Sequence, residues 1–126
     1  MSVHIPVSIG ELWDKYTILL IKQNKVTDKT KLNHVNNELN YLNTFMEKYH
    51  YKDNKLFIQL KSINEKLWDI EDNIRLKEKE KNFDDEFIEL ARAVYYTNDK
   101  RGDVKKEINV LFNSAIHEVK NYEKYN

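Results

Sequence analysis

Residues 8–21 read SIGELWDKYTILLI, and they predict the most buried helix of the protein. Ser8 is a good N-cap, because its hydroxyl accepts a hydrogen bond from a first-turn backbone N–H, and Glu11 completes the pattern of a capping box. Apolar residues surround most of the helix that follows, which we expect to extend from Ile9 to about Lys25. A helix that is apolar nearly all round belongs at the centre of a fold.

The residues before this helix predict a short extended arm. Val3 to Val7 alternate apolar with other residues, and Pro6 is the only proline of the chain. Proline lacks the backbone N–H that a helix interior or a central strand requires. We therefore expect an arm over residues 1–7 and helices over residues 8–126, all in one domain.

Two further helices are predicted by single apolar stripes. Between residues 32 and 49, and again between residues 56 and 74, apolar side chains recur at intervals of three and four. A capping side chain precedes each stripe, Asp28 for the first and Asp53 or Asn54 for the second.

The last segment begins at its cap, Asp84, and carries a stripe from Phe87 to Val119. A polar turn that includes Gly102 interrupts the stripe at residues 97–102. The segment is either one long helix or two helices that meet at an elbow, and we favour the continuous helix because the stripe stays in phase. The expected fold is all-α, an antiparallel helical bundle of four or five helices with a short extended N-terminal arm.

Composition excludes several classes of function. The chain has 126 residues, no cysteine, two glycines, and 21 basic against 21 acidic side chains. The zero formal charge argues against nucleic acid as a partner, since such affinity depends on uncompensated cations. Without cysteine there is neither a disulfide scaffold nor a thiolate zinc site, and two glycines do not build a phosphate-binding loop.

Membrane and export signals are also missing from the sequence. The longest apolar run, residues 18–21, is far shorter than the roughly 20 residues of a membrane span. Residues 1–7 lack the basic start and the apolar run of a signal peptide. We expect a cytoplasmic protein, in the host cytoplasm if it is viral.

Polar residues on apolar stripes mark the candidate ligand site. Asn98 and Arg101 fall on the stripe of the last segment, Asp99 flanks them, and Asp14 and Lys15 are charges in the central helix. A buried Arg needs a carboxylate partner, because an unpaired buried charge costs several kcal/mol. Two interpretations follow: a closed ion-pair network that fixes helix register, or a pocket for a phosphate-bearing small ligand.

Three carboxylates line one face of the third helix. Glu65, Asp69 and Asp72 stand at positions i, i+4 and i+7, and such aligned acids repel one another unless cations neutralise them. A Mg²⁺ site shared with acids of a facing helix is one interpretation. The other is a solvated face that nearby lysines and arginines balance.

Three segments resemble a known family. They read IPVSIGELWDKYTIL at residues 5–19, LWDIEDNIR at residues 67–75 and FIELARAVYYTNDKR at residues 87–101. Together they resemble a small bacterial and viral family catalogued as a domain of unknown function, the one numbered 6165. The resemblance implies a compact helical domain and no particular reaction. Gly102 departs from the Ala-like residue of that family.

A second likeness is to the all-α nucleotide pyrophosphohydrolases. That class holds Mg²⁺ with a Glu-x-x-Glu on one helix and a Glu-x-x-Asp on the next. Here Asp69-x-x-Asp72 and Glu86-x-x-Glu89 have a similar separation, and three of the four positions hold the other acid.

Two functions follow from these observations. The first is a non-catalytic helical interaction or accessory domain that needs no cofactor and forms a homo-oligomer. The motivation is the amount of apolar helix surface in so short a chain. The alternative is a Mg²⁺-dependent hydrolase of a nucleotide or nucleotide sugar.

Overall fold

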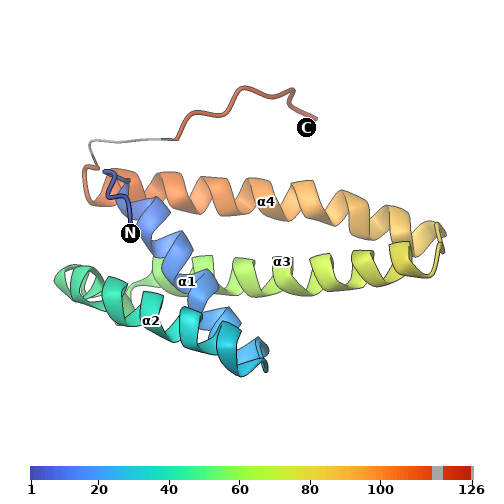
Figure 1. Ribbon diagram of the computed structural model, residues 1–126. Helices are drawn as coiled ribbons and strands as arrows, with labels where there is room; N and C mark the ends of the chain where they lie inside the picture. Colours follow the sequence, from blue (N-terminus) through green and yellow to red (C-terminus); the bar gives the residue numbers. More distant parts are fainter. Residues whose placement is uncertain (115–117, 126) are drawn as a thin grey trace.

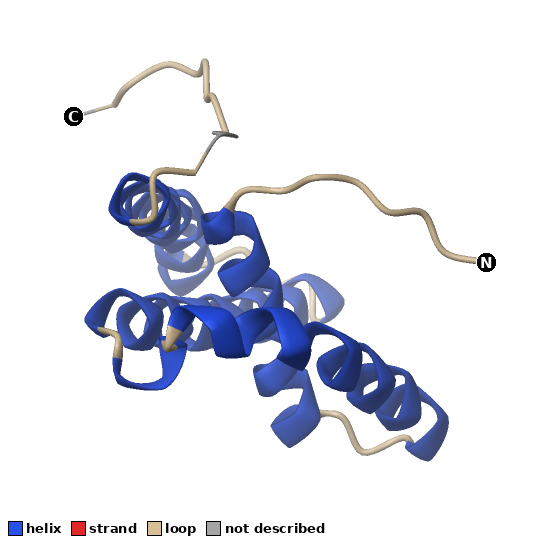
Figure 2. Cartoon of the chain, turned by 90° about the vertical axis from the view of Figure 1, so that its left-hand side faces the viewer, coloured by secondary structure: helices blue, strands red, loops and turns tan. Residues whose placement is uncertain are grey.

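The computed structural model describes residues 1–114 and 118–125. In the described part of the chain the regular structure is all helical, which confirms the predicted fold class (Figures 1 and 2). Helix α1 spans Ile9–Lys25, α2 spans Lys29–Met46, α3 spans Lys55–Lys79 and α4 spans Asp85–Leu111. Two short 3₁₀ turns, Glu47–Tyr49 and Tyr51–Asp53, connect α2 to α3.

Each α-helix begins at a capping side chain that sequence analysis identified. The side chains of Ser8, Asp28, Asn54 and Asp84 accept hydrogen bonds from backbone N–H groups in the first turns of α1, α2, α3 and α4. These bonds satisfy donors that have no partner within the helix. Local chemistry therefore sets where the helices start.

Helix α1 is the centre of the arrangement, as predicted. Helices α3 and α4 form a long antiparallel hairpin, α1 crosses this hairpin near one end, and α2 lies against α1 (Figure 1). α1 contacts all three other helices. Its side chains are covered to different degrees: Leu19 is buried, whereas the next residue, Leu20, points about 100° away and is half-buried.

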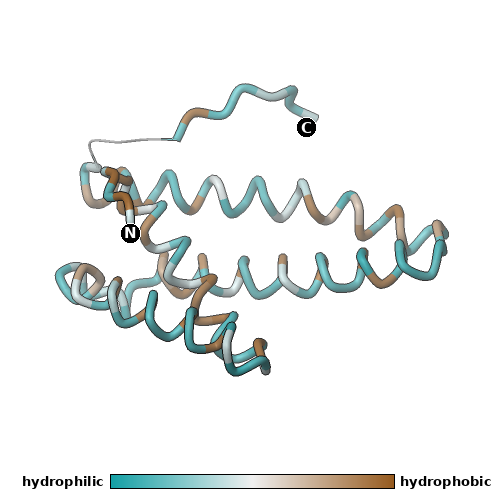
Figure 3. Tube along the Cα trace, viewed as in Figure 1, coloured by the Kyte–Doolittle hydropathy of each residue, from teal (hydrophilic) through white to brown (hydrophobic). Residues whose placement is uncertain are grey.

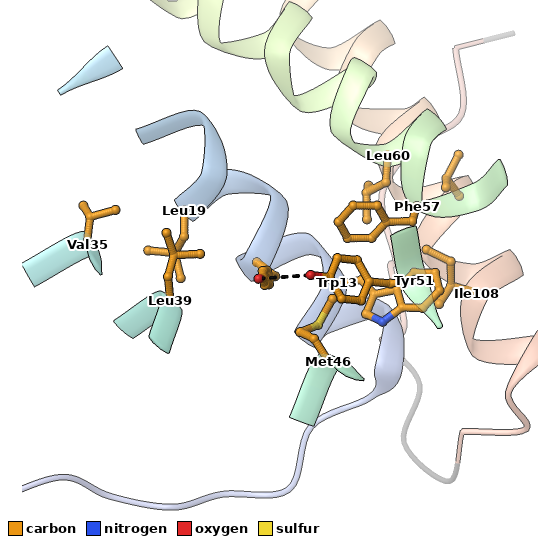
Figure 4. Close-up of a cluster of buried hydrophobic side chains, with 11 residues drawn as sticks. Trp13, Leu19, Val35, Leu39, Met46, Tyr51, Phe57, Leu60 and Ile108 are labelled. Atoms are coloured by element: carbon orange, nitrogen blue, oxygen red, sulfur yellow. Dashed lines mark hydrogen bonds between the residues drawn. The ribbon is translucent and has the colours of Figure 1, made fainter. Parts of the chain in front are cut away.

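The core lies around Trp13, where α1 crosses the hairpin (Figure 4). The indole of Trp13 is fully buried and packs edge-on against the rings of Phe57 and Phe112, with centroids 5.4 and 5.2 Å away. The hydroxyls of Tyr16 and Tyr51 lie 3.3 Å apart beside it. Edge-to-face aromatic pairs of this kind stabilise a core beyond the area that they bury.

Helix α4 is continuous through the polar turn and Gly102, as we favoured, but it ends earlier than its stripe predicts. It stops at Leu111, and the left-handed Asn113 follows with φ of 50°. The N–H groups of Asn113 and Ser114 bond the carbonyls of Val110 and Asn109, which is a Schellman motif.

The expected helices over residues 8–126 are therefore corrected at the C-terminus. Val119 lies in a non-helical segment, residues 118–125, and is exposed, so it is no part of the helix stripe. Ala115, which the stripe also included, lies outside the described residues.

Beyond the crossing of α1, the described helices of the hairpin are α3 and α4, and Tyr125 of the C-terminal segment packs on Tyr95 and Tyr96 of α4. Lys25, the last residue of α1, reaches Asp69 of α3 with a charged-atom separation of 3.9 Å. Apolar residues continue to the far end of both α3 and α4 (Figure 3). We call residues 70–96 the hairpin end.

Candidate functional site

A polar cluster, four of whose six members are buried, joins α1, α3 and α4. We call it the Asp14 cluster, and its members are Asp14, Thr17, Asn64, Asn98, Arg101 and Lys105. At its centre, Arg101 Nε donates to Asp14 Oδ1 over 2.8 Å, and a second guanidinium nitrogen donates to Asp14 Oδ2. Asp14 is only 2% exposed. A two-point Arg–carboxylate contact fixes orientation as well as distance.

Amides and a hydroxyl complete the shell around this ion pair. Asn64 Nδ2 donates to Asp14 Oδ1 over 2.9 Å and to Thr17 Oγ1 over 2.8 Å. The Thr17 hydroxyl in turn donates to the backbone carbonyl of Asp14. A third nitrogen of Arg101 donates to Asn98 Oδ1 over 3.1 Å. The buried polar groups thus satisfy one another, which buried groups require.

Lys105 extends the cluster one helical turn along α4. Its ammonium lies 2.9 Å from Glu11, 3.2 Å from Glu118 and 3.9 Å from Asp14. The residue is 8% exposed. Arg101 and Lys105 therefore share three carboxylates, so their positive charge is compensated within the chain.

The two cations hold their protons firmly. The hydrogen bond to Asp14 raises the pKa of Arg101 above its ordinary value, against the opposing effect of burial. Burial alone would lower the pKa of Lys105, but the hydrogen bond to Glu11 and the charge of Asp14 more than compensate and raise it. A lysine with a raised pKa is a permanent charge near neutral pH and is unsuited to act as a general base.

A backbone contact fixes the position of α1 on α4 beside the cluster. The N–H of Gly10 donates to Asn109 Oδ1 over 2.7 Å, and both residues are buried. A Cβ at Gly10 would lie 2.6 Å from the carbonyl oxygen of Lys105, which is closer than real Cβ atoms approach. Glycine is therefore required here for the two helices to come this close.

The structure brings together three of the five residues predicted for a ligand site. Asp14, Asn98 and Arg101 meet in the Asp14 cluster. Lys15 is absent from it because the next position on a helix points about 100° away. Its ammonium lies 2.9 Å from Glu38 of α2.

Asp99 is also elsewhere. It lies on the outer side of α4, where its carboxylate accepts hydrogen bonds from the hydroxyls of Tyr122 and Tyr125. Its neighbour Asn98 instead accepts a hydrogen bond from Arg101, so adjacent residues of one helix have again separated.

The three predicted metal ligands do not converge. Glu65 lies 3.0 Å from Lys61, Asp69 lies 3.9 Å from Lys25, and Asp72 is exposed. Within residues 1–114 and 118–125, the structure shows no group of three or more His, Asp or Glu side chains that could hold a metal ion. The solvated, lysine-balanced face is the interpretation that these contacts favour.

Of the acids that resemble a pyrophosphohydrolase pattern, Asp69 and Glu86 lie beside lysines, and Asp72 and Glu89 are exposed. Glu86 shares the ammonium of Lys77 with the cap residue Asp84, at 3.1 and 2.9 Å. Glu89 is exposed on the outer surface of α4. Among the described residues, no lysine or arginine forms an ion pair with Asp72 or Glu89, so no contact indicates that these two acids share a site.

Sequence reasoning missed three members of the cluster, Thr17, Asn64 and Lys105. The signal for Asn64 was present, because it stands four residues after Leu60 and three before Leu67 on the stripe of α3. Lys105 follows Arg101 by four residues and therefore shares its face of α4. Polar residues at these positions indicate buried partners as clearly as Arg101 does.

One surface depression lies away from the cluster. It has a volume of about 590 Å³ and lies between α3 and α4, with Ile58, Lys100 and Glu107 in its lining. None of its lining residues belongs to the Asp14 cluster. The depression and the Asp14 cluster are therefore separate features of the structure.

No known protein family, curated protein or solved structure matches the chain. The resemblance to the family of unknown function therefore stays a prediction. No helix in the described part of the chain is both long and apolar enough to cross a lipid bilayer.

Proposed function

We propose that this chain is a non-catalytic helical interaction domain of the cytoplasm that self-associates through its N-terminal arm. The observation that supports self-association is the arm itself. Met1, Val3, Ile5 and Val7 occupy alternate positions, and each is at least 46% exposed. Alternate positions of an extended segment share one side, so the arm presents an uncovered apolar edge.

An apolar surface for such an arm lies on α2. His4 contacts Tyr41 with a nitrogen-to-hydroxyl distance of 3.3 Å, and the rings of Tyr41 and Phe45 are 5.7 Å apart. Both aromatic residues are largely exposed. In a twofold dimer, the arm of each copy covers these two rings on the other copy, and the contact repeats symmetrically.

The Asp14 cluster supports a non-catalytic role. Its cations and carboxylate bond one another, and the pKa of Lys105 is raised. A side chain that acts as a catalytic base or binds a charged ligand must remain available to the substrate or ligand. Charges that are compensated in this way fix the register of α1 against α3 and α4 instead.

Sedimentation velocity of the purified protein tests self-association. We expect a dimer whose fraction grows with protein concentration up to about 100 μM, because association follows mass action. Ile5→Lys should shift the protein to the monomer, since it places a charge on the apolar edge. Ser2→Lys, on the other side of the same arm, is the matched control and should leave the dimer intact. A wild-type protein that stays monomeric throughout contradicts the proposal.

A thermal-shift panel tests the absence of catalysis. Nucleotides and sugar nucleotides are added with and without Mg²⁺, and we expect no combination to raise Tm. A rise of several degrees with one metal–nucleotide pair, which reports binding to the native state, would favour the hydrolase instead.

A further inference from the structure

Helix α1 covers one continuous stripe on each helix of the hairpin. On α3 this stripe includes Phe57 and Asn64, which are buried, and Asn64 bonds Asp14 and Thr17 of α1. On α4 it includes Arg101 and Lys105, which bond Asp14 and Glu11 of α1. α1 thus fills the third position of a three-helix arrangement.

Both stripes continue past the end of α1. Steps of three and four residues lead on α3 from Asn64 through 67, 71 and 74 to 78, and on α4 from Arg101 back through 98, 94 and 91 to 87. Most of these positions are half-buried, whereas the stripe beneath α1 is buried except at the half-buried Arg101. We call this surface the distal face, and its side chains are Leu67, Glu71, Ile74, Glu78, Phe87, Ala91 and Val94.

The chemistry of the distal face is apolar with acidic margins. Ile74, Phe87 and Val94 supply its centre, and Glu71 and Glu78 flank Ile74 on α3. Each of these acids has one exposed cation beside it: Arg75 lies 3.3 Å from Glu71, and Lys81 lies 3.2 Å from Glu78. Across the hairpin end, eight acidic and five basic side chains give a net charge of −3, so the rest of the chain carries +3.

We infer that the distal face is a docking surface for a basic amphipathic helix of another protein. Such a helix takes the position that α1 holds nearer the core, with apolar residues toward Phe87 and Val94 and Lys or Arg toward Glu71 and Glu78. The face extends over residues 87–98 of α4, which at 1.5 Å per residue corresponds to about 17 Å, or three turns. The hairpin end of a second copy is a poor occupant, because both surfaces are acidic.

This inference adds a partner class to the proposed interaction domain, and it does not depend on exchange of the arm. A fluorescein-labelled 14-residue peptide of leucine and lysine, with the leucines on one helical face, is the probe. The matched peptide has glutamate in place of lysine. Fluorescence anisotropy with the full chain should show saturable binding of the lysine peptide and at least tenfold weaker binding of the glutamate peptide.

Charge variants locate the site. Glu71→Lys/Glu78→Lys should weaken the lysine peptide at least tenfold, and the milder Glu71→Gln/Glu78→Gln should weaken it less. Glu107→Lys/Glu123→Lys alters net charge equally at exposed positions away from the distal face and should bind as wild type does. Equal affinity for the two peptides, or equal weakening by both lysine variants, would overturn the inference.

Sedimentation of the same proteins separates this inference from arm exchange. If Ala91→Glu abolishes a dimer that Ile5→Lys leaves intact, the occupant of the distal face is a second copy and the inference is wrong. If the wild type is monomeric yet binds the lysine peptide at Glu71 and Glu78, arm exchange fails and the docking surface stands.

Discussion

Replacing Arg101 by methionine tests whether the Asp14 cluster is a closed network. Asp14 is 2% exposed, and Arg101 supplies hydrogen bonds to both of its carboxylate oxygens. Methionine keeps most of the apolar volume but removes these bonds and the compensating charge. The carboxylate is then left buried without its main partner.

The expected loss can be bounded from the contacts that remain. Breaking a buried ion pair by removing one partner costs about 3–5 kcal/mol. Asn64 still donates to Asp14 over 2.9 Å, and Lys105 remains 3.9 Å away. We therefore expect the lower end, about 3 kcal/mol, which for a urea m-value near 1.5 kcal/mol/M lowers the unfolding midpoint by about 2 M.

Urea unfolding followed by tryptophan fluorescence, to which buried Trp13 and half-buried Trp68 both contribute, measures this loss. Arg75→Met is the control, because the Arg75–Glu71 pair lies on the surface and should contribute less than about 0.5 kcal/mol. Asp14→Asn combined with Arg101→Met should recover part of the loss, since the uncompensated charge is gone. A loss below about 1 kcal/mol for Arg101→Met would mean that water reaches Asp14, and the closed-network interpretation would then be refuted.

Two further predictions concern the glycines and the C-terminal segment. Gly10→Ala should destabilise the protein by about 1–3 kcal/mol, because its Cβ would meet the carbonyl of Lys105. Gly102→Ala should stabilise it by up to about 1 kcal/mol, because only a flexible lysine side chain lies nearby. Urea unfolding gives the free energy of unfolding of both variants, and equal changes in the two would contradict the reasoning. The hydrogen bond to Asp99 raises the pKa of Tyr125, so the contact persists below the ordinary tyrosine pKa of about 10 and is lost as pH rises further. The difference between the absorbance titrations of the wild type and of Tyr125→Phe should give this phenol a pKa above that of ordinary tyrosines, and Asp99→Asn should return the pKa to the ordinary value. A Tyr125 pKa at the ordinary value in the wild type would show that the C-terminal segment does not dock on α4.

Much of the fold was predictable because its determinants are local. A cap such as Ser8 or Asp84 acts on N–H groups within three residues, so sequence alone identifies it. The early end of α4 was missed because the apolar stripe appeared to continue to Val119. The competing local signal was Asn113, a residue type that tolerates the left-handed conformation at a helix terminus.

The candidate site was predictable only where a single residue broke a pattern. Arg101 on an apolar stripe indicated a buried carboxylate partner, and Asp14 was one of the charges assigned to the same candidate site. The pairing itself depends on how α1 crosses α4, which no local pattern contains. Lys15 and Asp99 were included because they adjoin Asp14 and Asn98 in sequence, yet adjacent residues of a helix diverge by about 100°.

The contacts of α1 have a consequence for the order in which the chain folds. Gly10 and Asn109 are 99 positions apart, and Asp14 and Arg101 are 87 apart. The α3–α4 hairpin, in contrast, closes through the neighbouring residues Lys77 and Asp84. Because local contacts form before distant ones, the hairpin should assemble first and α1 should dock late. During synthesis α2 follows α1 directly and can cover part of it, but the face of α1 that packs on α3 and α4 stays uncovered until the hairpin forms. That face is therefore the part of the chain most in need of chaperone protection.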